Sequence, residues 1–538
     1  MKKIFKSIHP FLFTIYPILY LYSENIGLLS FADIRNSLLA SLGLVSFFLV
    51  FLNFKLKNVN QRGEKVAIFL SICSLLFFSY GHFFNITREM AMSYLSPGSV
   101  LNSLLLDEGV ILSIFILGLA APSFFLFSKI VQSNKINDFN NFLNITSFAL
   151  ILISVLSIAS YGAKGEHINI PEGENYHNSE ANQLAEKTNL PDIYYIVLDG
   201  YGREDVLKNI YDYDNSEFIN FLEDKGFYIA DKSRSNYCQS CLSVASFLNL
   251  RYINYLEEEM GPDNHDRSPL KELFEKNKTV EFLKSLGYKF INFPVGYFCI
   301  NESPLADLNI NFGSWLSDRM FERLLAQTTI LKPLVKTTGL GAGDDPVHEK
   351  RRKALDSFSV LETIPEMDAP TFVYAHLMVP HPPFVFNSDG GELKKETFCF
   401  LADGDWWQKR CGREEDYIRE YKNQLIYTNS LVKKTIEVIL EKSEKPPLIV
   451  LQADHGPGAQ LKWDDPEKTN MTERMGILNA YYLPGEVHEE LYPSVTPVNS
   501  LRIIFNTYFG TDYELLEDKS YFSTWSKPYD FIEVSEEE

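Results

Sequence analysis

Five apolar stretches in the first 162 residues constrain this chain more than any other feature. They lie near Pro10–Ser30, Ser37–Phe54, Val66–Phe84, Val110–Phe127 and Phe142–Tyr161. Each has about the 17–25 residues that a membrane-spanning helix needs, which predicts a transmembrane region of about five helices over residues 1–163. Glu24 interrupts the first stretch. A cleaved signal peptide is the alternative for that stretch, although no small-residue cleavage site closes the apolar run.

Basic residues predict the orientation of these helices. Nine of them fall at the N-terminus and in alternate loops, whereas the opposite loops hold only Arg35 and Arg88. The nine are Lys2, Lys3, Lys6, Lys55, Lys57, Arg62, Lys65, Lys129 and Lys135. Under the positive-inside rule, the N-terminus is cytoplasmic and five spans deliver everything after Gly162 to the outer face. We therefore expect a multi-pass protein of the inner (cytoplasmic) membrane with its large domain on the periplasmic or extracellular side.

The part of the chain after Gly162 is strongly acidic. It holds 39 of the 50 Lys+Arg and 63 of the 70 Asp+Glu, so its net charge is -24. Such a domain repels nucleic acid, and nucleic-acid binding is excluded. Residues 164–190 are polar and lack periodicity, which predicts a linker, and residues 191–538 then form the outer domain.

Buried-strand patterns alternate with helical periodicity from Asp192 onward. The predicted strands are Ile193–Leu198, Lys289–Phe293, Thr371–Leu377 and Leu448–Gln452. Helical periodicity covers Ser216–Lys225, Thr279–Leu286 and Asp416–Leu440. This alternation predicts an α/β sandwich around a largely parallel sheet, and such sheets bind ligands at the carboxyl ends of their strands.

Metal-competent side chains follow three of these strands. Ile193–Leu198 runs into Asp199, and Leu448–Gln452 leads to Asp454 and His455. Thr371–Leu377 contains His376, and a His-Pro-Pro element begins at His381 just beyond it. A lone aspartate at a strand end is often only a cap or turn residue. Carboxylates and imidazoles from separate strand ends, however, can converge on a zinc or manganese ion.

These motifs resemble the alkaline phosphatase superfamily, and in particular its membrane-anchored sulfatase-like branch with lipoteichoic acid synthases and phosphoethanolamine transferases. The resemblance covers roughly residues 192–484 and includes the five-helix anchor. It implies an alkaline-phosphatase-like α/β/α sandwich with Asp199, Asp454 and His455 as metal ligands, a hydroxyl nucleophile about forty residues after the first strand, and His381 near the transferred group. His376 is then a second histidine of that site. True sulfatases have two adjacent acids in the first motif, whereas here glycine follows Asp199.

The nucleophile is expected just before an apolar helical run that begins near Leu242. A hydroxyl there lies at the positive end of the helix, which favours an alkoxide and a bound phosphate. Relatives carry Thr or Ser at about Ser240, which we predict to be the nucleophile and a further metal ligand. Ser243 and Ser235 are the alternatives, and a cap role alone for Ser240 is the simplest other interpretation. The C/S-x-P-x-R context needed for formylglycine is absent from the segments that begin at Cys238 and at Ser240.

Of the six cysteines, Cys73 lies in a predicted span and five lie in the outer domain, where disulfides can persist. Cys399 and Cys411 bracket a short polar loop and are the preferred pair. An odd number leaves at least one thiol free or paired between chains. Cys238 and Cys241 flank Ser240 as C-x-x-C, and a disulfide between them that holds the nucleophile turn stays an alternative.

A few other features are less specific. Arg203 can reach an anionic substrate or point into solvent, and Glu473-Arg474 is by default a surface ion pair. Tyrosines 417, 421 and 427 have helical spacing and are expected in the core. Trp406-Trp407 forms either a lipid- or glycan-facing surface or a packed pair under the suspected disulfide.

Together these observations predict a membrane-anchored, metal-dependent phosphoryl transferase or hydrolase. Its partners would be a phospholipid donor and an envelope lipid or glycan acceptor. The alternatives are a sulfuric ester hydrolase and a non-catalytic, lipid-sensing member of the same fold.

Overall fold

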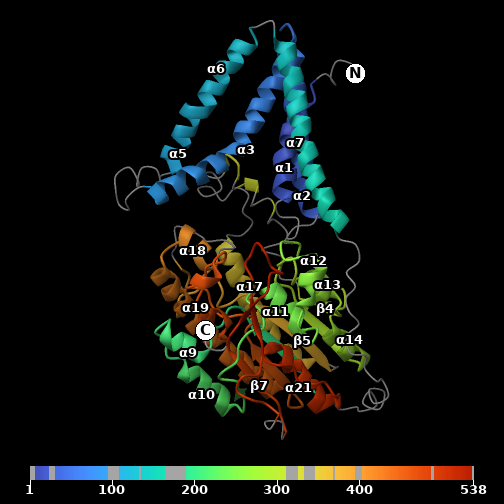
Figure 1. Cartoon of the computed structure of the whole chain (residues 1–538), viewed down its shortest axis with the longest axis vertical. Coiled ribbons are helices and arrows are strands. Elements are labelled where there is room, and N and C mark those ends of the chain that lie inside the picture. The colour runs from blue at the N-terminus through green and yellow to red at the C-terminus, as the bar shows by residue number, and fades with distance from the viewer. Residues whose placement is uncertain are drawn as a thin grey trace. The chain divides into compact units, whose positions relative to one another are not determined.

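The computed structural model describes residues 7–23, 31–94, 108–132, 135–164, 190–310, 321, 325–326, 328–331, 346–367, 370–393, 403–485 and 490–535. The chain divides into two compact units (Figure 1). The first contains Met1–His167 and Ser317–Gly343, and the second contains Ile168–Leu316 and Asp344–Glu538. Most of the predicted linker lies outside the described residues.

The first unit is helical. Its helices are α1 (His9–Ser23), α2 (Phe31–Lys55), α3 (Arg62–Tyr94), α5 (Glu108–Phe115), the π-helical turn η2 (Ile116–Ala120), α6 (Ala121–Ile130) and α7 (Ile136–Lys164). Among the described residues, four helical stretches are long and apolar enough to cross a membrane: Ile34–Lys55, Arg62–Phe84, Gly109–Ile130 and Ile136–Ala159. Four of the five predicted spans are thus found as helices. The first predicted span, Pro10–Ser30, contains α1, and its residues 24–30 lie outside the described part of the chain.

The helices of this unit are held together by a buried polar cluster as well as by apolar packing. His9 on α1 contacts Ser71 Oγ on α3 at 2.6 Å through Nδ1 and Asn140 Oδ1 on α7 at 3.0 Å through Nε2. Large apolar side chains face outward instead, for example Phe47, which is 61% exposed, and Leu117, which is 73% exposed. An outward apolar surface is expected for helices surrounded by lipid.

The second unit is built on a mixed seven-stranded sheet with the order β2-β7-β6-β1-β5-β3-β4. Its strands are β1 (Ile193–Leu198), β2 (Tyr228–Ile229), β3 (Lys289–Phe293), β4 (Leu308–Asn309), β5 (Thr371–Leu377), β6 (Leu448–Gln452) and β7 (Asn479–Tyr482). The four predicted strands are all present and mutually parallel, from β6 through β1 and β5 to β3. Among the described strands of this sheet, only β7 runs antiparallel to its neighbours β6 and β2. A small hairpin, β8 (Ser520–Phe522) and β9 (Ile532–Val534), lies apart from this sheet.

Helices cover both faces of the sheet. They are α9 (Glu204–Asn209), α10 (Ser216–Asp224), α11 (Ser240–Phe247), α12 (Tyr255–Met260), α13 (Ser268–Glu275), α14 (Lys278–Ser285), α17 (Pro346–Leu361), η3 (Ile364–Glu366), α18 (Gly404–Arg410), α19 (Glu414–Lys442), η4 (Pro466–Lys468), α20 (Met471–Met475) and α21 (Pro497–Phe509).

Side chains of β1 alternate between two cores. Tyr195 and Val197 pack with α11, α13, α14 and α21, whereas Tyr194 and Ile196 pack with α10, α17 and α19. A strand buried on both faces needs the continuous apolar run seen here, because each face meets a helix layer. The predicted α/β sandwich is confirmed.

Candidate active site

Four of the predicted site residues meet at the carboxyl ends of three adjacent strands. Asp199 follows β1, His376 is the last residue but one of β5, and Asp454 and His455 follow β6. His376 Nε2 lies 3.1 Å from Asp199 Oδ2 and 3.8 Å from Asp454 Oδ2. His455 Nε2 lies 3.6 Å from Asp199 Oδ1 and 3.6 Å from Asp454 Oδ2. Parallel register places β5 and β6 on either side of β1, and their ends therefore form a single site.

His381 approaches the same site from the loop after β5. Its backbone N–H donates to the Asp199 carbonyl at 3.0 Å. Gly200 packs against the His381 side chain and has a φ of +70°, a left-handed backbone conformation that favours glycine. Its N–H also donates to Asp454 Oδ1 at 3.2 Å. Glycine at this turn thus supplies both the left-handed backbone and the contact between the two acidic motifs.

Two overlapping sets of these side chains have the spacing of a metal site. One set is Asp199, His376 and Asp454, and the other is Asp199, His381 and His455. Asp199 Oδ1 and Asp454 Oδ2 are buried and have no hydrogen-bond partner among the described residues. Buried carboxylate oxygens without donors are costly unless a cation binds them, so this site fits a divalent metal. Mixed carboxylate and imidazole ligands suit zinc and manganese.

Charges in the site are strongly coupled. Burial alone would raise the pKa of Asp199, but the imidazoles of His381, His376 and His455 lower this pKa below its ordinary value. Burial lowers the pKa of His455, and Arg474 lowers it further. Its Nδ1 lies 2.9 Å from the Gly456 carbonyl and donates to it, which leaves the Nε2 lone pair facing the carboxylates. His455 therefore has the neutral tautomer that binds metals.

His381 has the opposite charge preference. Burial opposes its protonation, but Asp199 and Asp403 together raise its pKa to about 9. Its Nε2 lies 3.4 Å from Asp403 Oδ2. His381 is therefore a cation at neutral pH in the metal-free site, suited to hold or donate a proton.

Ser240 is the first residue of α11, and its hydroxyl contacts the cluster of candidate metal ligands. Ser240 Oγ lies 3.2 Å from His455 Nε2. The residue at the N-cap is Gln239, and no side chain makes a cap hydrogen bond there, so a capping role for Ser240 is wrong. The alternatives are engaged elsewhere: Ser243 Oγ donates to the Asp454 carbonyl at 2.7 Å, and Ser235 Oγ donates to Met475 Sδ at 3.4 Å.

The cysteines pair differently from the C-x-x-C alternative. Cys241 forms a disulfide with Cys299, 58 residues away, so a Cys238–Cys241 bridge is wrong. Cys238 is buried and free, and its thiol donates to the Ser523 carbonyl at 3.3 Å. The close spacing of Cys238 and Cys241 in sequence does not predict their pairing, because the two side chains contact different partners in the fold. Cys411 is disulfide-bonded, and its predicted partner Cys399 lies outside the described residues.

Asp403 and Arg474 support the site and were not predicted in this role. Asp403 accepts from Arg474 at 3.0 Å and from Tyr417 at 2.7 Å. Arg474 also donates to the carbonyls of Cys238 at 2.9 Å and Gly456 at 3.1 Å. This guanidinium therefore joins the turn before Ser240 to the turn after His455. No local pattern marks these pairings, because the partners come from distant segments.

The prediction of a surface ion pair at Glu473-Arg474 is wrong. Both side chains are buried, and they point to different partners. Glu473 accepts from the N–H groups of Ala459 at 2.9 Å and Gln460 at 2.7 Å. Burial raises its pKa to about 7. The side chains of Glu473 and Arg474 point in different directions from the short helix α20. Two opposite charges that are adjacent in sequence therefore do not form an ion pair here.

The backbone after His381 is held by two further side chains that sequence patterns did not indicate. Buried Lys350 donates to the carbonyls of His381 and Pro383, each at 2.8 Å. Gln424 donates to the His381 carbonyl at 3.0 Å and to that of Pro380 at 2.9 Å. Together they fix the loop that presents His381.

The remaining sequence features have plain structural roles. Arg203 pairs with Asp205 at 2.6 Å and donates to the Ser233 carbonyl at 2.9 Å, so it is not a free solvent-facing side chain. Trp407 is buried against Phe384, which excludes it from a surface, and Trp406 is half-buried against other tryptophans. The predicted core role is confirmed for Tyr417 and Tyr421, which are buried, and for Tyr427, which is half-buried.

Comparisons with known proteins identify the family of the domain that carries this site. The model of the Sulfatase family matches residues 191–501, more than half of the chain. No curated protein matches the chain in sequence.

Several solved structures resemble this chain. The zinc complex of the C-terminal periplasmic domain of EptC from Escherichia coli has 13% identity and a TM-score of 0.40, over 65% of this chain and 94% of that one. The lipooligosaccharide phosphoethanolamine transferase A (EptA) from Neisseria meningitidis has 14% identity and a TM-score of 0.37, over 90% and 89%. A phosphonate monoester hydrolase of Agrobacterium radiobacter has 13% identity and a TM-score of 0.38, over 62% and 80%. Likeness at this level assigns neither a substrate nor a reaction.

Proposed function

This chain belongs to the sulfatase family, and we propose that it is a membrane-anchored, metal-dependent phosphoryl transferase or hydrolase that uses Ser240 as its nucleophile. The observation that carries the proposal is the contact of 3.2 Å between Ser240 Oγ and His455 Nε2 inside a cluster of buried acids and histidines. A hydroxyl next to a metal-binding cluster, at the start of a helix, is the arrangement that phosphoryl transfer needs.

Asp199, Asp454, His455 and the Ser240 hydroxyl would hold the metal, with His376 as a further ligand. Zinc or manganese is the expected ion. A bound divalent cation would lower the pKa of the serine hydroxyl and neutralise charge on the phosphoryl oxygens.

The chain's own residues supply the rest of the mechanism. Ser240 Oγ attacks phosphorus, the bond to the leaving oxygen breaks, and a phosphoserine forms. His381 faces the site next to Asp403, so in its protonated form it can stabilise the phosphoryl oxygens or protonate the leaving oxygen. Asp403 holds that imidazole in place. A sugar hydroxyl, a lipid hydroxyl or water then attacks the phosphoserine and frees Ser240.

The membrane anchor favours lipid and envelope substrates. A domain tethered to the bilayer stays close to a phospholipid donor and to an envelope lipid or glycan acceptor. We propose five spans, with the stretch from Pro10 to Ser30 as the first, and an outer domain on the periplasmic or extracellular side. The basic residues of the loops near Lys57 and Lys135 support this orientation.

One assay separates the reaction classes. Purified full-length protein in detergent is loaded with zinc or manganese and incubated with a chromogenic phosphodiester, a phosphomonoester and a sulfate ester, with and without chelator. We expect chelator-sensitive release from a phosphate ester and none from the sulfate ester. Metal-dependent release from the sulfate ester alone would support a sulfuric ester hydrolase, and a metal-free, inactive protein would support the non-catalytic alternative.

A further inference from the structure

A segment late in the chain lies along the segment that leads to Ser240. We call residues 519–525 the strap and residues 235–239 the approach segment. The Tyr521 N–H in the strap donates to the Asn236 carbonyl at 2.8 Å, and the Asn236 side chain donates to the Lys519 carbonyl at 3.0 Å. The strap lies beyond residue 501, where the match to the Sulfatase family model ends. The family match therefore assigns no role to the strap.

Ser523 of the strap binds the last two residues of the approach segment. The Cys238 thiol donates to the Ser523 carbonyl at 3.3 Å, and the Ser523 N–H donates to Cys238 Sγ at 3.3 Å. The side-chain amide nitrogen of Gln239 lies 3.2 Å from both the carbonyl and the hydroxyl of Ser523 and 3.0 Å from the Thr524 carbonyl. Gln239 is buried, so these contacts take the place of hydrogen bonds to water. The nitrogen end of the amide is thus bound to the strap.

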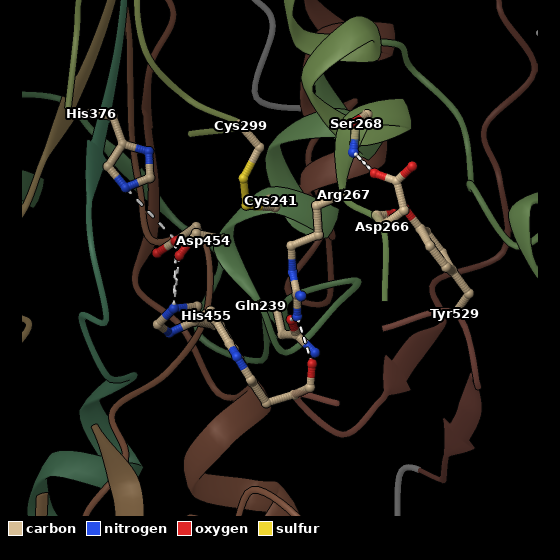
Figure 2. The surroundings of a disulfide bond; sticks show 12 residues. Gln239, Cys241, Asp266, Arg267, Ser268, Cys299, His376, Asp454, His455 and Tyr529 are labelled. Atoms are coloured by element: carbon tan, nitrogen blue, oxygen red, sulfur yellow. Dashed lines mark hydrogen bonds and ion pairs between the residues drawn. A yellow bond between two sulfur atoms is a disulfide. The ribbon is translucent and has the colours of Figure 1, made fainter. Parts of the chain in front are cut away.

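Arg267 binds the oxygen end of the same amide. Its guanidinium donates to Gln239 Oε1 at 3.0 Å and to the Trp525 carbonyl in the strap at 2.7 Å. It also stacks on the Trp525 ring, with its central carbon 4.3 Å from the ring centroid. Figure 2 shows Gln239 and Arg267 joined by this hydrogen bond, close to the Cys241–Cys299 disulfide. A hydrogen bond from a charged donor is stronger than one between neutral groups, so the Gln239 side chain is firmly held at both ends.

Gln239 also determines where the nucleophile helix starts. It is the N-cap of α11 and has an extended backbone, and its carbonyl accepts from the N–H groups of Leu242 at 3.1 Å and Ser243 at 3.0 Å. Ser240 is the next residue, and its Oγ lies 3.2 Å from His455 Nε2. A shift of Gln239 would therefore move the Ser240 hydroxyl relative to the candidate metal ligands.

We propose that the strap positions Ser240 for attack and that Gln239 is the positioning residue through which the strap acts. The inference rests on the proposed function, because it takes Ser240 as the nucleophile. Reacting atoms must lie about 3–3.5 Å apart and be aligned, and a displacement of about 1 Å can lower the rate about a hundredfold. Loss of the Gln239 amide should therefore slow the chemical step, while Asp199, Asp454 and His455 still hold the metal.

The test measures kcat and KM for a chromogenic phosphodiester with the purified, metal-loaded full-length protein in detergent. The variants are Gln239→Met, which keeps the length of the side chain and removes its amide, Ser523→Ala, and both substitutions together. Asn506→Leu is the matched control, because it removes a half-buried amide that makes two hydrogen bonds of 2.8 Å with the Tyr513 backbone. Metal content and the thermal midpoint are measured on every sample.

We expect Gln239→Met to lower kcat about a hundredfold and to leave KM and metal content unchanged. Ser523→Ala removes one contact of the same amide and should lower kcat about three- to tenfold. The double variant should be no slower than Gln239→Met, because both changes remove the same interaction. Asn506→Leu should lower the thermal midpoint and keep the wild-type kcat, which separates the positioning of Ser240 from a loss of stability.

A wild-type kcat in folded Gln239→Met would overturn the role of Gln239. Losses that multiply in the double variant would overturn the link between Gln239 and the strap. If Gln239→Met fails to fold, Ser523→Ala decides: a lower kcat at constant KM and metal content supports the inference, and an unchanged kcat overturns it.

Hydrogen exchange keeps this inference separate from the proposed function. Gln239→Met should speed exchange of the backbone amides in the first turn of α11, whether or not the protein turns over phosphate esters. A wild type without such turnover would contradict the proposed function. Faster exchange in Gln239→Met would then still support the hold of the strap on α11, and unchanged exchange would overturn it.

Discussion

Ser240 Oγ lies 3.2 Å from His455 Nε2, although the two residues are 215 positions apart in the chain. Ser240 begins α11, and His455 follows β6 at the carboxyl edge of the sheet. The contact joins the candidate nucleophile to the candidate metal ligands. Substitutions at its two ends should therefore have separable effects, since one removes the attacking oxygen and the other removes the metal.

Asp454→Ala and His455→Ala should each lower the bound zinc or manganese at least about tenfold while the domain stays folded. Both residues lie beyond the end of β6 and contribute little to the apolar core. Elemental analysis of the purified variants measures the metal, and the thermal midpoint is compared with that of chelator-treated wild type. Asp464→Ala, at an exposed position nearby, is the control and should keep its metal. Unchanged metal in both ligand variants would exclude this metal site.

His381, whose pKa is raised by Asp199 and Asp403, should make the stability of the metal-free protein depend on pH in a defined window. The pKa of His381 is raised from 6.5 to about 9 in the folded state. A raised histidine pKa stabilises the fold fully below the unfolded pKa, and this stabilisation is lost as pH rises through the folded pKa. The contribution of His381 to stability should thus fall between about pH 6.5 and pH 9.

Asp403→Asn removes one of the two carboxylates that raise the pKa of His381, the one at 3.4 Å, so it should make this contribution smaller while Asp199 keeps part of it. The measurement is the unfolding midpoint of chelator-treated protein across that pH range, for wild type and variant. Asp403→Asn also weakens the contact with Arg474, which lowers stability at every pH, so the slope is the informative quantity. Parallel curves for the two proteins would show that Asp403 does not contribute to the dependence.

The outer domain should lie on the outer side of the membrane whether or not α1 crosses the membrane. The four described candidate spans by themselves place the loops near Lys57 and Lys135 on one side and the outer domain on the other. A C-terminal tag should therefore be accessible outside the intact cell. An N-terminal tag should be protected, provided that the first stretch crosses the membrane as we propose. Protease digestion of intact cells that spares the outer domain would contradict the orientation.

The sheet could be predicted from sequence because its central strands are buried on both faces. Continuous apolar runs such as Ile193–Leu198 are distinctive, and the acids that follow them mark the carboxyl edge. The sequence did not predict β7, Asn479–Tyr482. Its four residues, which include an asparagine and two tyrosines, are equally typical of a loop and of a strand. The predicted first stretch continues to Ser30, and its last residues, 24–30, lie outside the described part of the chain.

The site could be predicted only where ligands are adjacent to strands. Asp199, Asp454 and His455 have that signal, and the structure brings them together. Arg474 has no such signal, because its partner Asp403 lies 71 residues away. The Cys241–Cys299 bond spans 58 residues, and the nearer Cys238 suggested a different pair. Long-range pairings of this kind depend on the tertiary fold and leave no local pattern.

The account depends most on Ser240 as the attacking oxygen. Ser240→Ala removes that oxygen and leaves the proposed ligands Asp199, Asp454 and His455 in place. Ser240→Thr keeps a hydroxyl at the same position. Ser246→Ala is the matched control on the same helix: its Oγ donates to the Arg251 carbonyl at 2.7 Å, so its loss should cost about 0.5–1.5 kcal/mol of stability and leave turnover intact.

The decisive measurement is turnover of a chromogenic phosphodiester by these variants, with covalent phosphate on the protein followed by mass spectrometry. We predict that Ser240→Ala loses nearly all turnover and carries no trapped phosphate, that Ser240→Thr retains substantial activity, and that Ser246→Ala behaves as the wild type. Near-normal turnover by folded Ser240→Ala would contradict Ser240 as the nucleophile and, with it, the proposed mechanism.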